Sequence, residues 1–482
     1  MGDSNRERFP LMIPGAKGSG VIEVAAPFDR SSIAEVEGAD LAAVDHALST
    51  AHALYRNRGA WLTVARRIEI LERAAEIMAE RAETLAVEAA REGGKPLLDS
   101  RVEVARAIDS VRICVEVLRT EAGHHIPMNL NAASLNRLAV TRREPIGPVV
   151  AVSAFNHPLN LIAHQVAPAV ATGCPVIVKP AEVTPLSCFR FVDILWEAGL
   201  PPEWCQALVA SDLKVAEALV TDPRVAFFSF IGSARVGWML RSKLAPGTRC
   251  ALEHGGAAPV LVAGDADLDV ALPSIAKGGF YHAGQVCVSV QRVFAHRGIA
   301  DDFAKRLADA AGKLRVGDPT SAETEVGPLI RPAEVERVGA WVDEAKAAGA
   351  TVLTGGSPIS ETCYAPTVLM NPPEDAKVSQ MEIFGPVVCV YPFDDVDDAI
   401  GRANALPFAF QSAIFTRDID TAMHAFAALD ASAVMVNDHT AFRVDWMPFA
   451  GLRQSGYGVG GIPHTMRDMS IEKMLVIRSP EL

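Results

Sequence analysis

Apolar residues recur with helical spacing through the first quarter of the chain, and strand patterns begin only after it. The helical spacing covers 41–58, 61–92 and 98–119. Apolar runs at 136–141 and 147–153 then have the length and composition of strands. The sequence therefore predicts a helical opening followed by a region that contains β-structure.

Strands and helices alternate from there on. The predicted strands are 176–179, 207–210 and 225–230, and the predicted helices between them are 186–199, 212–221 and 234–244. This alternation is typical of a doubly wound parallel sheet covered by helices. A second alternating region has strands at 260–262, 293–295, 387–392, 413–415 and 433–436. We therefore predict an α/β protein with a cofactor domain and a second α/β domain.

The balance of charges is acidic. The 482 residues carry 45 Lys and Arg against 58 Asp and Glu, a net charge of −13 at pH 7, and half of them are hydrophobic. A chain of this length and composition buries a large core and divides into two or three domains. Without a Lys/Arg cluster it is poorly suited to a phosphate backbone or an acidic bilayer. We expect neither a nucleic-acid partner nor a membrane partner.

Cysteine usage and the amino terminus bear on location. The eight cysteines are scattered, without a CxxC pair or the His/Cys spacing of a metal site. This pattern favours reduced thiols and no bound metal. Residues 1–6 lack the apolar core of a signal peptide, and no apolar run is long enough to cross a bilayer. The sequence predicts a cytoplasmic protein.

Three short segments carry side chains suited to acyl chemistry on a carbonyl. Cys287 stands among residues too small to shield a thiol, so it is a candidate nucleophile. Glu253 precedes two glycines and is a candidate general base. Asn156 follows an apolar strand and can donate hydrogen bonds to an oxyanion. Taken singly, each has a structural alternative: a buried small hydrophobe, a strand-end carboxylate, and a turn or helix-cap residue.

Further blocks accompany these three segments. They are 175–185, 228–233, 382–387, 448–451 and 455–456. In order and local sequence, all the blocks together resemble the NAD(P)-dependent aldehyde dehydrogenase superfamily. The sequence departs from the family pattern at Ile231, where a Phe-Thr-Gly-Ser turn has threonine, and at 210–212, where many relatives have Gly-x-Gly.

The resemblance implies an organisation in three parts. The cofactor domain would comprise 1–123 and 144–255, and the catalytic domain 256–460. Residues 124–143 and 461–482 would form a small projecting sheet that pairs subunits into a homodimer or homotetramer. An apolar strand at the end of a chain is otherwise a hazardous free edge.

The resemblance also implies a reaction. The Cys287 thiolate attacks an aldehyde, and the Asn156 side chain holds the oxyanion of the thiohemiacetal together with the cysteine amide. Hydride passes to the nicotinamide ring, and Glu253 then activates water to hydrolyse the thioester. Relatives that release the acyl group to coenzyme A typically lack this base, so the expected product is a carboxylic acid. The resemblance also places Lys179 among the catalytic residues.

Cofactor contacts are expected at the carboxyl ends of the first set of strands. Lys179 ends the 176–179 strand, and Glu182 can accept both adenosine ribose hydroxyls. A carboxylate there would repel a 2′-phosphate, which favours NAD, while Lys179 leaves NADP open. Gly232 and Ser233 open a helix, where amide groups can face a pyrophosphate. The resemblance adds three residues to the cofactor site: Phe155, Glu382 and Phe384.

Polar side chains predict a small polar aldehyde. His157 follows Asn156, and Asn160 and His164 share one face of a helix expected over 158–171. These residues make the predicted substrate tunnel more polar than a tunnel for fatty or aromatic aldehydes.

Two arginines suggest that the substrate is anionic. Arg106 resembles a position that holds the anionic end of the substrate in relatives acting on phosphorylated or phosphonylated aldehydes, and Arg443 lies in a late loop beside the tunnel. In the alternative, Arg106 pairs with Asp109 and Arg443 with Asp445, which leaves an aldehyde dehydrogenase for neutral or aromatic aldehydes.

Two other classes are open to the same residues. His254 and His282 flank the catalytic candidates, so a Cys/His hydrolase without a nucleotide is conceivable. That class does not account for Lys179, Glu182 or Glu382. A non-catalytic structural relative would predict a broken active site, whereas the three catalytic candidates are intact.

Overall fold

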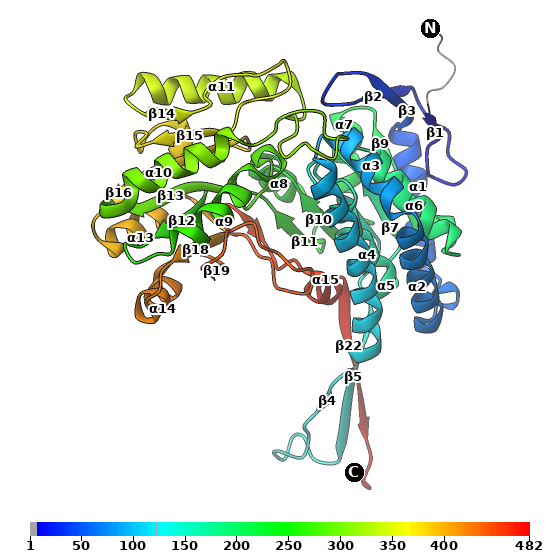
Figure 1. The fold of residues 1–482 in the computed structure, drawn as a ribbon. Helices are drawn as coiled ribbons and strands as arrows, with labels where there is room; N and C mark the ends of the chain where they lie inside the picture. The colour runs from blue at the N-terminus through cyan, green and yellow to red at the C-terminus, as the bar shows by residue number, and fades with distance from the viewer. Residues whose placement is uncertain (1–6, 122) are drawn as a thin grey trace.

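The computed structural model describes residues 7–121 and 123–482. Two lobes, each built on a sheet, stand side by side, and a narrow three-stranded sheet projects from them (Figure 1). Residues 1–6, for which the sequence predicts no signal peptide, lie outside the described residues. Among the described helices, none has both the length and the apolar character needed to cross a membrane.

Four helices follow three short N-terminal strands that the apolar pattern does not reveal. The strands are β1 (Glu7–Phe9), β2 (Val21–Ala25) and β3 (Ser32–Ala39), and the helices are α1 (Leu41–Arg56), α2 (Val64–Glu80), α3 (Ala82–Gly93) and α4 (Leu97–Thr120). The single helix expected over 61–92 is two helices, because Arg81 leaves the helical region with φ −105° and ψ 12°. Gly94 ends α3 with a φ of +75°, a conformation that suits glycine.

The first lobe contains a six-stranded sheet in the order β21-β11-β10-β6-β7-β8. Its parallel strands are β6 (Val149–Val152), β7 (Val176–Lys179), β8 (Cys205–Ala207), β10 (Phe227–Ile231) and β11 (Arg249–Glu253). Between them run α5 (Asn160–Thr172), α6 (Leu186–Glu197), α7 (Leu213–Thr221) and α8 (Ala234–Arg241). The strand expected over 207–210 is divided: β8 joins this sheet, while β9 (Val209–Ala210) pairs with β3.

The second lobe contains a seven-stranded sheet in the order β14-β15-β16-β13-β12-β18-β19. The strands are β12 (Ala258–Val262), β13 (Val290–His296), β14 (Thr351–Thr354), β15 (Thr367–Met370), β16 (Val387–Phe393), β18 (Gln411–Phe415) and β19 (Ala433–Val436). The helices are α9 (Leu268–Phe280), α10 (Arg297–Gly312), α11 (Pro332–Ala347), α12 (Lys377–Gln380), α13 (Val396–Asn404) and α14 (Ile419–Ala428). All pairs are parallel except β14 with β15, so the predicted parallel α/β architecture is confirmed.

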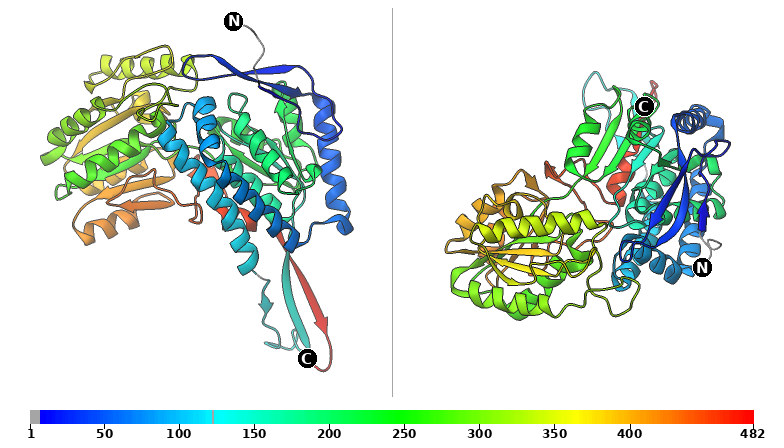
Figure 2. Two further views of the ribbon diagram at one scale, coloured as in Figure 1. Left: turned by 45° about the vertical axis from the view of Figure 1, so that its right-hand side comes forward. Right: turned by 90° about the horizontal axis from the view of Figure 1, so that it is seen from above.

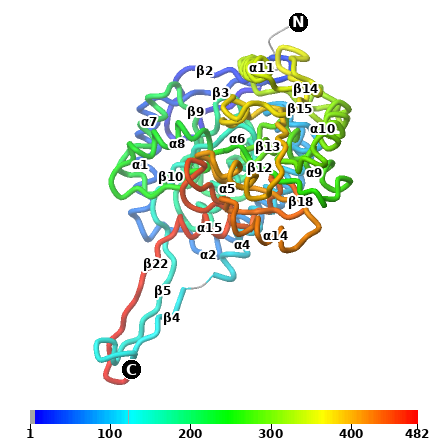
Figure 3. Tube along the Cα trace, turned by 90° about the vertical axis from the view of Figure 1, so that its left-hand side faces the viewer, coloured from blue at the N-terminus to red at the C-terminus, as the bar shows by residue number. Residues whose placement is uncertain are grey.

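The projecting sheet consists of β4 (His125–Ile126), β5 (Arg137–Pro145) and β22 (Ser470–Arg478). The last strand pairs antiparallel with β5 along its whole length (Figure 3). Most of β22 is exposed, including four consecutive apolar side chains, Met474 to Ile477. The segment before it does not share this exposure: α15 (Ile462–Asp468) packs on α4 and α5 and places Ile462 and Met466 in the first core.

The chain crosses between the lobes near its end. β20 (Leu452–Arg453) pairs with β17 (Phe408–Ala409), and β21 (Gly456–Tyr457) then adds antiparallel to β11. The residues of β21 thus lie in the first sheet although they fall within the predicted 256–460 segment. Two views of the ribbon show how this C-terminal segment bridges the lobes (Figure 2). Their hydrophobic cores are separate, so side chains at the boundary remain available for a site.

Candidate active site

Cys287 lies in a tight loop between α9 and β13. The loop begins with three residues of positive φ: His282 at +49°, Ala283 at +53° and Gly284 at +69°. Gly284 has no room for a Cβ, because the Gly385 carbonyl oxygen occupies that space. The partly exposed Cys287 packs against a small cluster formed by Val286, Val288, Phe410 and Phe449. The loop therefore holds the thiol at the lobe boundary in a conformation fixed by close packing.

Asn156 brings the first lobe to this loop. It follows β6, its side chain is buried, and its Nδ2 donates to the Gln285 carbonyl oxygen at 2.8 Å. The Gln285 side chain is fixed within the second lobe, since its Oε1 accepts from the Ile330 amide at 3.0 Å. The predicted oxyanion donor thus lies beside the predicted nucleophile, across 131 positions of sequence.

Glu253 and Glu382 each place a carboxyl group against a glycine, which has no side chain to exclude it. Glu253 ends β11, and its Oε1 takes the space that a Cβ on Gly460 would need. Glu382 Oε1 fills the same kind of space at Gly255 and has no hydrogen-bond partner among the described residues. Burial raises the pKa of Glu253, and it raises the pKa of Glu382 to about 8. Both groups therefore favour the protonated form more than an exposed carboxyl would.

The surroundings of Cys287 keep the thiol protonated at neutral pH. Burial raises its pKa to about 12, and Glu382 and Glu253 add to the increase. Arg443 acts in the opposite direction. The described residues contain no group of three or more His, Cys, Asp or Glu side chains arranged to hold a metal ion.

The predicted cofactor residues lie at the carboxyl ends of β7 and β10. Lys179 is buried at the end of β7, with Nζ 3.4 Å from Oε1 of the exposed Glu182. Gly232 and the exposed Ser233 form the turn between β10 and α8, and the Gly232 carbonyl lies 2.8 Å from His254 Nδ1. The Asp212 side chain caps α7, where the family pattern has glycines.

Phe155 and Phe384 bring the two lobes together on the cofactor side. Their rings meet edge to face, with centroids 5.8 Å apart. Phe384 has a φ of +49°, an uncommon conformation for a bulky residue, in the turn before Gly385. This turn also carries Glu382, so the three side chains face one region between the lobes.

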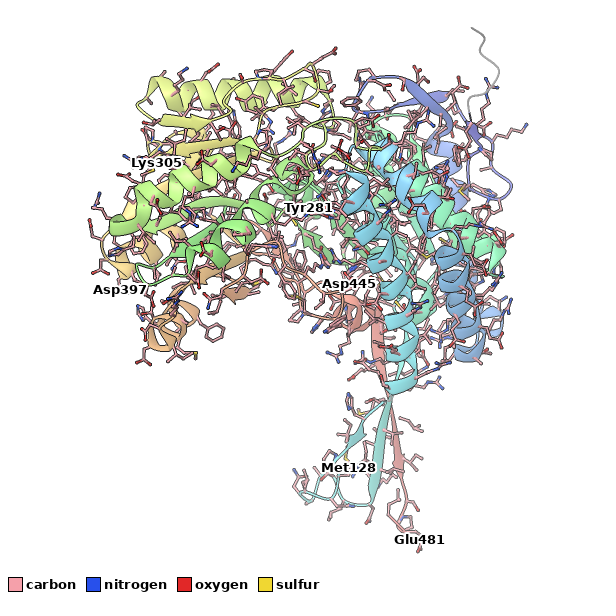
Figure 4. The ribbon with its side chains drawn as sticks, in the orientation of Figure 1. Met128, Tyr281, Lys305, Asp397, Asp445 and Glu481 are labelled. Atoms are coloured by element: carbon pink, nitrogen blue, oxygen red, sulfur yellow. The ribbon has the colours of Figure 1, made fainter. Side chains whose placement is uncertain are left out.

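On the other side of Asn156, the predicted substrate residues form a polar network. Arg106 on α4 donates to both oxygens of Asp445, at 3.1 Å from Nε and 2.6 Å from Nη2. His164 Nε2 lies 2.7 Å from Asp445 Oδ1, and Arg443 Nη2 lies 3.2 Å from His164 Nδ1. Figure 4 shows Asp445 and Tyr281 between the lobes. The local pairings of Arg106 with Asp109 and of Arg443 with Asp445 are therefore wrong.

The remaining two substrate candidates have different surroundings. His157 Nε2 lies 3.0 Å from the Tyr281 hydroxyl, next to the Cys287 loop. The Asn160 side chain is buried between helices, where its Oδ1 accepts a 3.5 Å hydrogen bond from Ser110. His157 thus belongs to the lobe boundary and Asn160 to the packing of α4 on α5.

Sequence reasoning missed several residues of the site. Asp445 entered only as an ion-pair partner, and Phe449 only as part of a motif. Glu103 was missed altogether: its Oε1 accepts from the Leu159 and Asn160 amides, so it fixes the start of α5. Asp445 stands only two positions after Arg443, a spacing that suggests a local pair, and nothing in the local sequence points to its actual partners, Arg106 and His164.

Comparison with known proteins gives the family. Residues 14–475 match the model of the aldehyde dehydrogenase family. The chain is 36% identical to 3-sulfolactaldehyde dehydrogenase of Priestia aryabhattai over 456 residues, which cover 95% of this chain and 94% of the relative.

Two solved structures have the same fold over nearly their whole length. One is aldehyde dehydrogenase 21 of Physcomitrella patens in complex with the reaction product succinate, with a TM-score of 0.94, 34% identity and 98% and 99% of the two chains covered. The other is the glyceraldehyde-3-phosphate dehydrogenase GapN of Methanocaldococcus jannaschii with NADP, with a TM-score of 0.90, 33% identity and 96% and 100% covered. The chain belongs to the aldehyde dehydrogenase family and is an NAD(P)-dependent oxidoreductase that acts on an aldehyde.

Proposed function

We propose that this enzyme oxidises a small aldehyde with an anionic end to the corresponding carboxylic acid. The observation that carries the proposal is Arg443, a partly buried cation close enough to Cys287 and Glu253 to shift the pKa of both. Its Nε has no hydrogen-bond partner among the described residues. A guanidinium whose buried Nε is an unused donor suits a carboxylate, sulfonate or phosphate. The sulfolactaldehyde dehydrogenase and the succinate complex among the relatives support the same substrate class.

Cys287 is the proposed nucleophile. Its sulfur adds to the aldehyde carbon once the thiol proton has left, and the carbonyl oxygen becomes an oxyanion. The Asn156 Nδ2 group and the Cys287 amide would donate to this oxyanion; the same Nδ2 now donates to a carbonyl two residues before Cys287. Glu253 and Glu382 raise the thiol pKa, so substrate and cofactor must change this balance for the thiolate to form.

Glu253 is the proposed base for the second half-reaction. It takes a proton from water as the water oxygen attacks the thioester carbon, and the carbon–sulfur bond breaks to return the thiolate. Its raised pKa makes it a better proton acceptor than an exposed glutamate. The product is then the free acid.

The residues at the carboxyl ends of β7 and β10, together with Glu382 before β16, fit a nicotinamide dinucleotide. The unpartnered, buried Glu382 Oε1 suits a ribose hydroxyl, and the Gly232–Ser233 turn suits the pyrophosphate. The bound dinucleotide would accept the hydride from the substrate carbon. Glu182, next to Lys179, favours NAD because its carboxylate would repel a 2′-phosphate.

The projecting sheet is the proposed subunit contact of a homodimer or homotetramer. The four apolar side chains on β22 are exposed in one chain, and association would cover them. All eight cysteines are unpaired, which supports a reducing, cytoplasmic location.

The test is the initial rate of nicotinamide reduction with NAD and with NADP. Succinic semialdehyde and phosphonoacetaldehyde would be compared with propanal, lactaldehyde and benzaldehyde. We expect saturable turnover of the anionic aldehydes with NAD, and none from Cys287→Ala. Glu253→Gln should give one equivalent of reduced cofactor per site and then stop, because the thioester is not hydrolysed. Turnover of neutral aldehydes alone would refute the anionic substrate class, and equal steady rates from Glu253→Gln would refute the base.

A further inference from the structure

Four side chains from three distant segments form one hydrogen-bonded chain in the order Arg106, Asp445, His164, Arg443. α4 supplies Arg106, α5 supplies His164, and the late loop supplies the other two residues. Asp445 and His164 are almost completely buried, at 2% and 5% exposure. We call this set the arginine anchor.

Hydrogen-bond chemistry fixes the state of the histidine. A guanidinium can only donate, so His164 Nδ1 must accept from Arg443, and the ring proton must lie on Nε2, from which it is donated to Asp445. Burial and the Arg443 charge lower the pKa of His164 to about 4, against the opposing effect of Asp445. The imidazole is therefore neutral at neutral pH.

The charges along the arginine anchor leave one positive charge. Arg106 offsets Asp445 through two hydrogen bonds, and His164 contributes none. Arg443 is thus held by a neutral acceptor and keeps its full charge. A carboxylate at position 164 would hold the guanidinium as firmly but would cancel the charge that an anionic substrate needs.

A second contact fixes the plane of the guanidinium. Arg443 Cζ lies 3.5 Å from the centroid of the Phe449 ring, and Phe449 packs on Phe410 with ring centroids 4.4 Å apart. Both rings belong to the cluster that contacts Cys287. The stacking and the His164 hydrogen bond together determine where Arg443 Nε and its neighbouring donors lie relative to the thiol.

We propose that His164 is a positioning residue that orients Arg443 toward the anionic end of the aldehyde without neutralising it, and that the Arg106–Asp445 pair sets its tautomer. This inference rests on the proposed function, since it concerns how that anion is recognised.

The experiment compares succinic semialdehyde with its uncharged methyl ester, methyl 4-oxobutanoate. The measured quantity is the ratio of kcat/KM for the acid to kcat/KM for the ester. In His164→Leu we expect this ratio to fall about tenfold or more through a higher KM for the acid, because Arg443 loses a charged hydrogen bond. The ester values should change by no more than about twofold, which also reports that the variant is folded.

Three further variants separate orientation from charge and from packing. His164→Asn keeps an acceptor near the Nδ1 position and should retain the ratio to within about threefold, whereas His164→Asp should lose it although it too offers an acceptor. Thr172→Val removes a buried polar group from the same helix, away from the arginine anchor, and should leave the ratio unchanged.

The outcomes are distinguishable. A wild-type enzyme that does not prefer the acid to the ester would overturn the proposed function, and this inference with it. A preference that Arg443→Gln abolishes but His164→Leu preserves would overturn only the positioning role. Equal losses for acid and ester in His164→Leu would show a merely structural histidine.

Discussion

Helix α4 contributes Glu103 to one ion pair and Arg106, one turn later, to another, and the two pairs differ in whether a net charge remains beside them. Lys95 and Glu103 are 2.5 Å apart, and both side chains are completely buried. The second carboxylate oxygen of Glu103 accepts from two amides at the start of α5. In this pair the charges cancel, and both carboxylate oxygens of Glu103 have partners. Its effect is to fix the backbone next to Asn156.

Arg106 and Asp445 form the other pair, at 2.6 Å, with Arg106 25% exposed. Their contact continues through His164 to Arg443, so the network as a whole retains a positive charge. The Lys95–Glu103 pair, whose charges cancel, therefore makes the structure rigid. The Arg106–Asp445 pair is linked to the unmatched charge of Arg443 and therefore serves substrate recognition. Removing a member of the first pair should affect all substrates equally, and removing a member of the second should affect anionic substrates.

The largest effect is expected from Lys95→Met. Glu103 would then be a buried carboxylate without its counter-charge, a change that typically costs about 3–5 kcal/mol. We expect a large decrease in the midpoint of thermal unfolding, measured by calorimetry, with the acid-to-ester ratio of the folded enzyme unchanged. Lys95→Met/Glu103→Gln removes both charges and keeps an acceptor for the α5 amides, so it should recover much of the loss. If Lys95→Met were as stable as the wild type, the Lys95–Glu103 pair would not stabilise the structure as argued.

A smaller but selective effect is expected from Arg106→Met. Asp445 would lose its counter-charge, and its negative potential would act through His164 on Arg443. We expect kcat/KM for succinic semialdehyde to fall about tenfold, the size of one lost charged hydrogen bond, while the value for methyl 4-oxobutanoate stays nearly constant. The unfolding midpoint should fall less than in Lys95→Met, because Arg106 is partly exposed. Parallel losses for the acid and the ester would contradict a role in recognition.

The sequence predicts the catalytic candidates because their signals are local. Cys287, Glu253 and Asn156 stand at strand ends or in glycine-rich turns that can be read within a few positions, and the strand–helix alternation specifies the two parallel sheets. The arginine anchor has no such local signal. Its Arg106–Asp445 ion pair joins positions 339 apart, so reasoning from helical spacing pairs Arg106 with Asp109 instead.

The missed elements have the same explanation. β21 consists of two residues, and only its pairing with β11 makes it a strand. β9 leaves the line of β8 because it pairs with Gly38 and Ala39 at the end of β3, a strand that the apolar pattern does not reveal. The break at Arg81 carries neither glycine nor proline, so periodicity alone continues the helix through it. For β9 and β21, a contact made far along the chain decides the local conformation.

The arginine anchor also predicts a dependence of stability on pH. Burial alone would raise the pKa of Asp445, but hydrogen bonds and charges from His164 and Arg106 outweigh it, and the pKa lies well below its usual range. A depressed carboxylate pKa contributes stability above the unfolded-state value, near 4, and this contribution is lost as the pH falls below it. Asp445→Asn should therefore lower the unfolding midpoint at pH 7 by several degrees, and the difference from wild type should shrink below about pH 4. The control is Asp375→Asn, a substitution of an exposed aspartate. If the difference in unfolding midpoint between Asp445→Asn and wild type did not vary with pH, the ion-pair account would be contradicted.

The smallest effect concerns the thiol. Burial raises the pKa of Cys287 to about 12, against the Arg443 charge, which lowers it. Arg443→Gln should raise this pKa further and slow alkylation by iodoacetamide severalfold at pH 8, since the thiolate is the reactive form. The rate is followed by loss of activity with methyl 4-oxobutanoate, and Cys287→Ala gives the labelling of the other cysteines. The Lys95→Met variant should be alkylated at the wild-type rate, because the charges of Lys95 and Glu103 cancel and the pair does not act on the thiol. Equal slowing in both variants would mean that alkylation reports loosened packing, and the contrast between the two ion pairs would then not extend to the nucleophile.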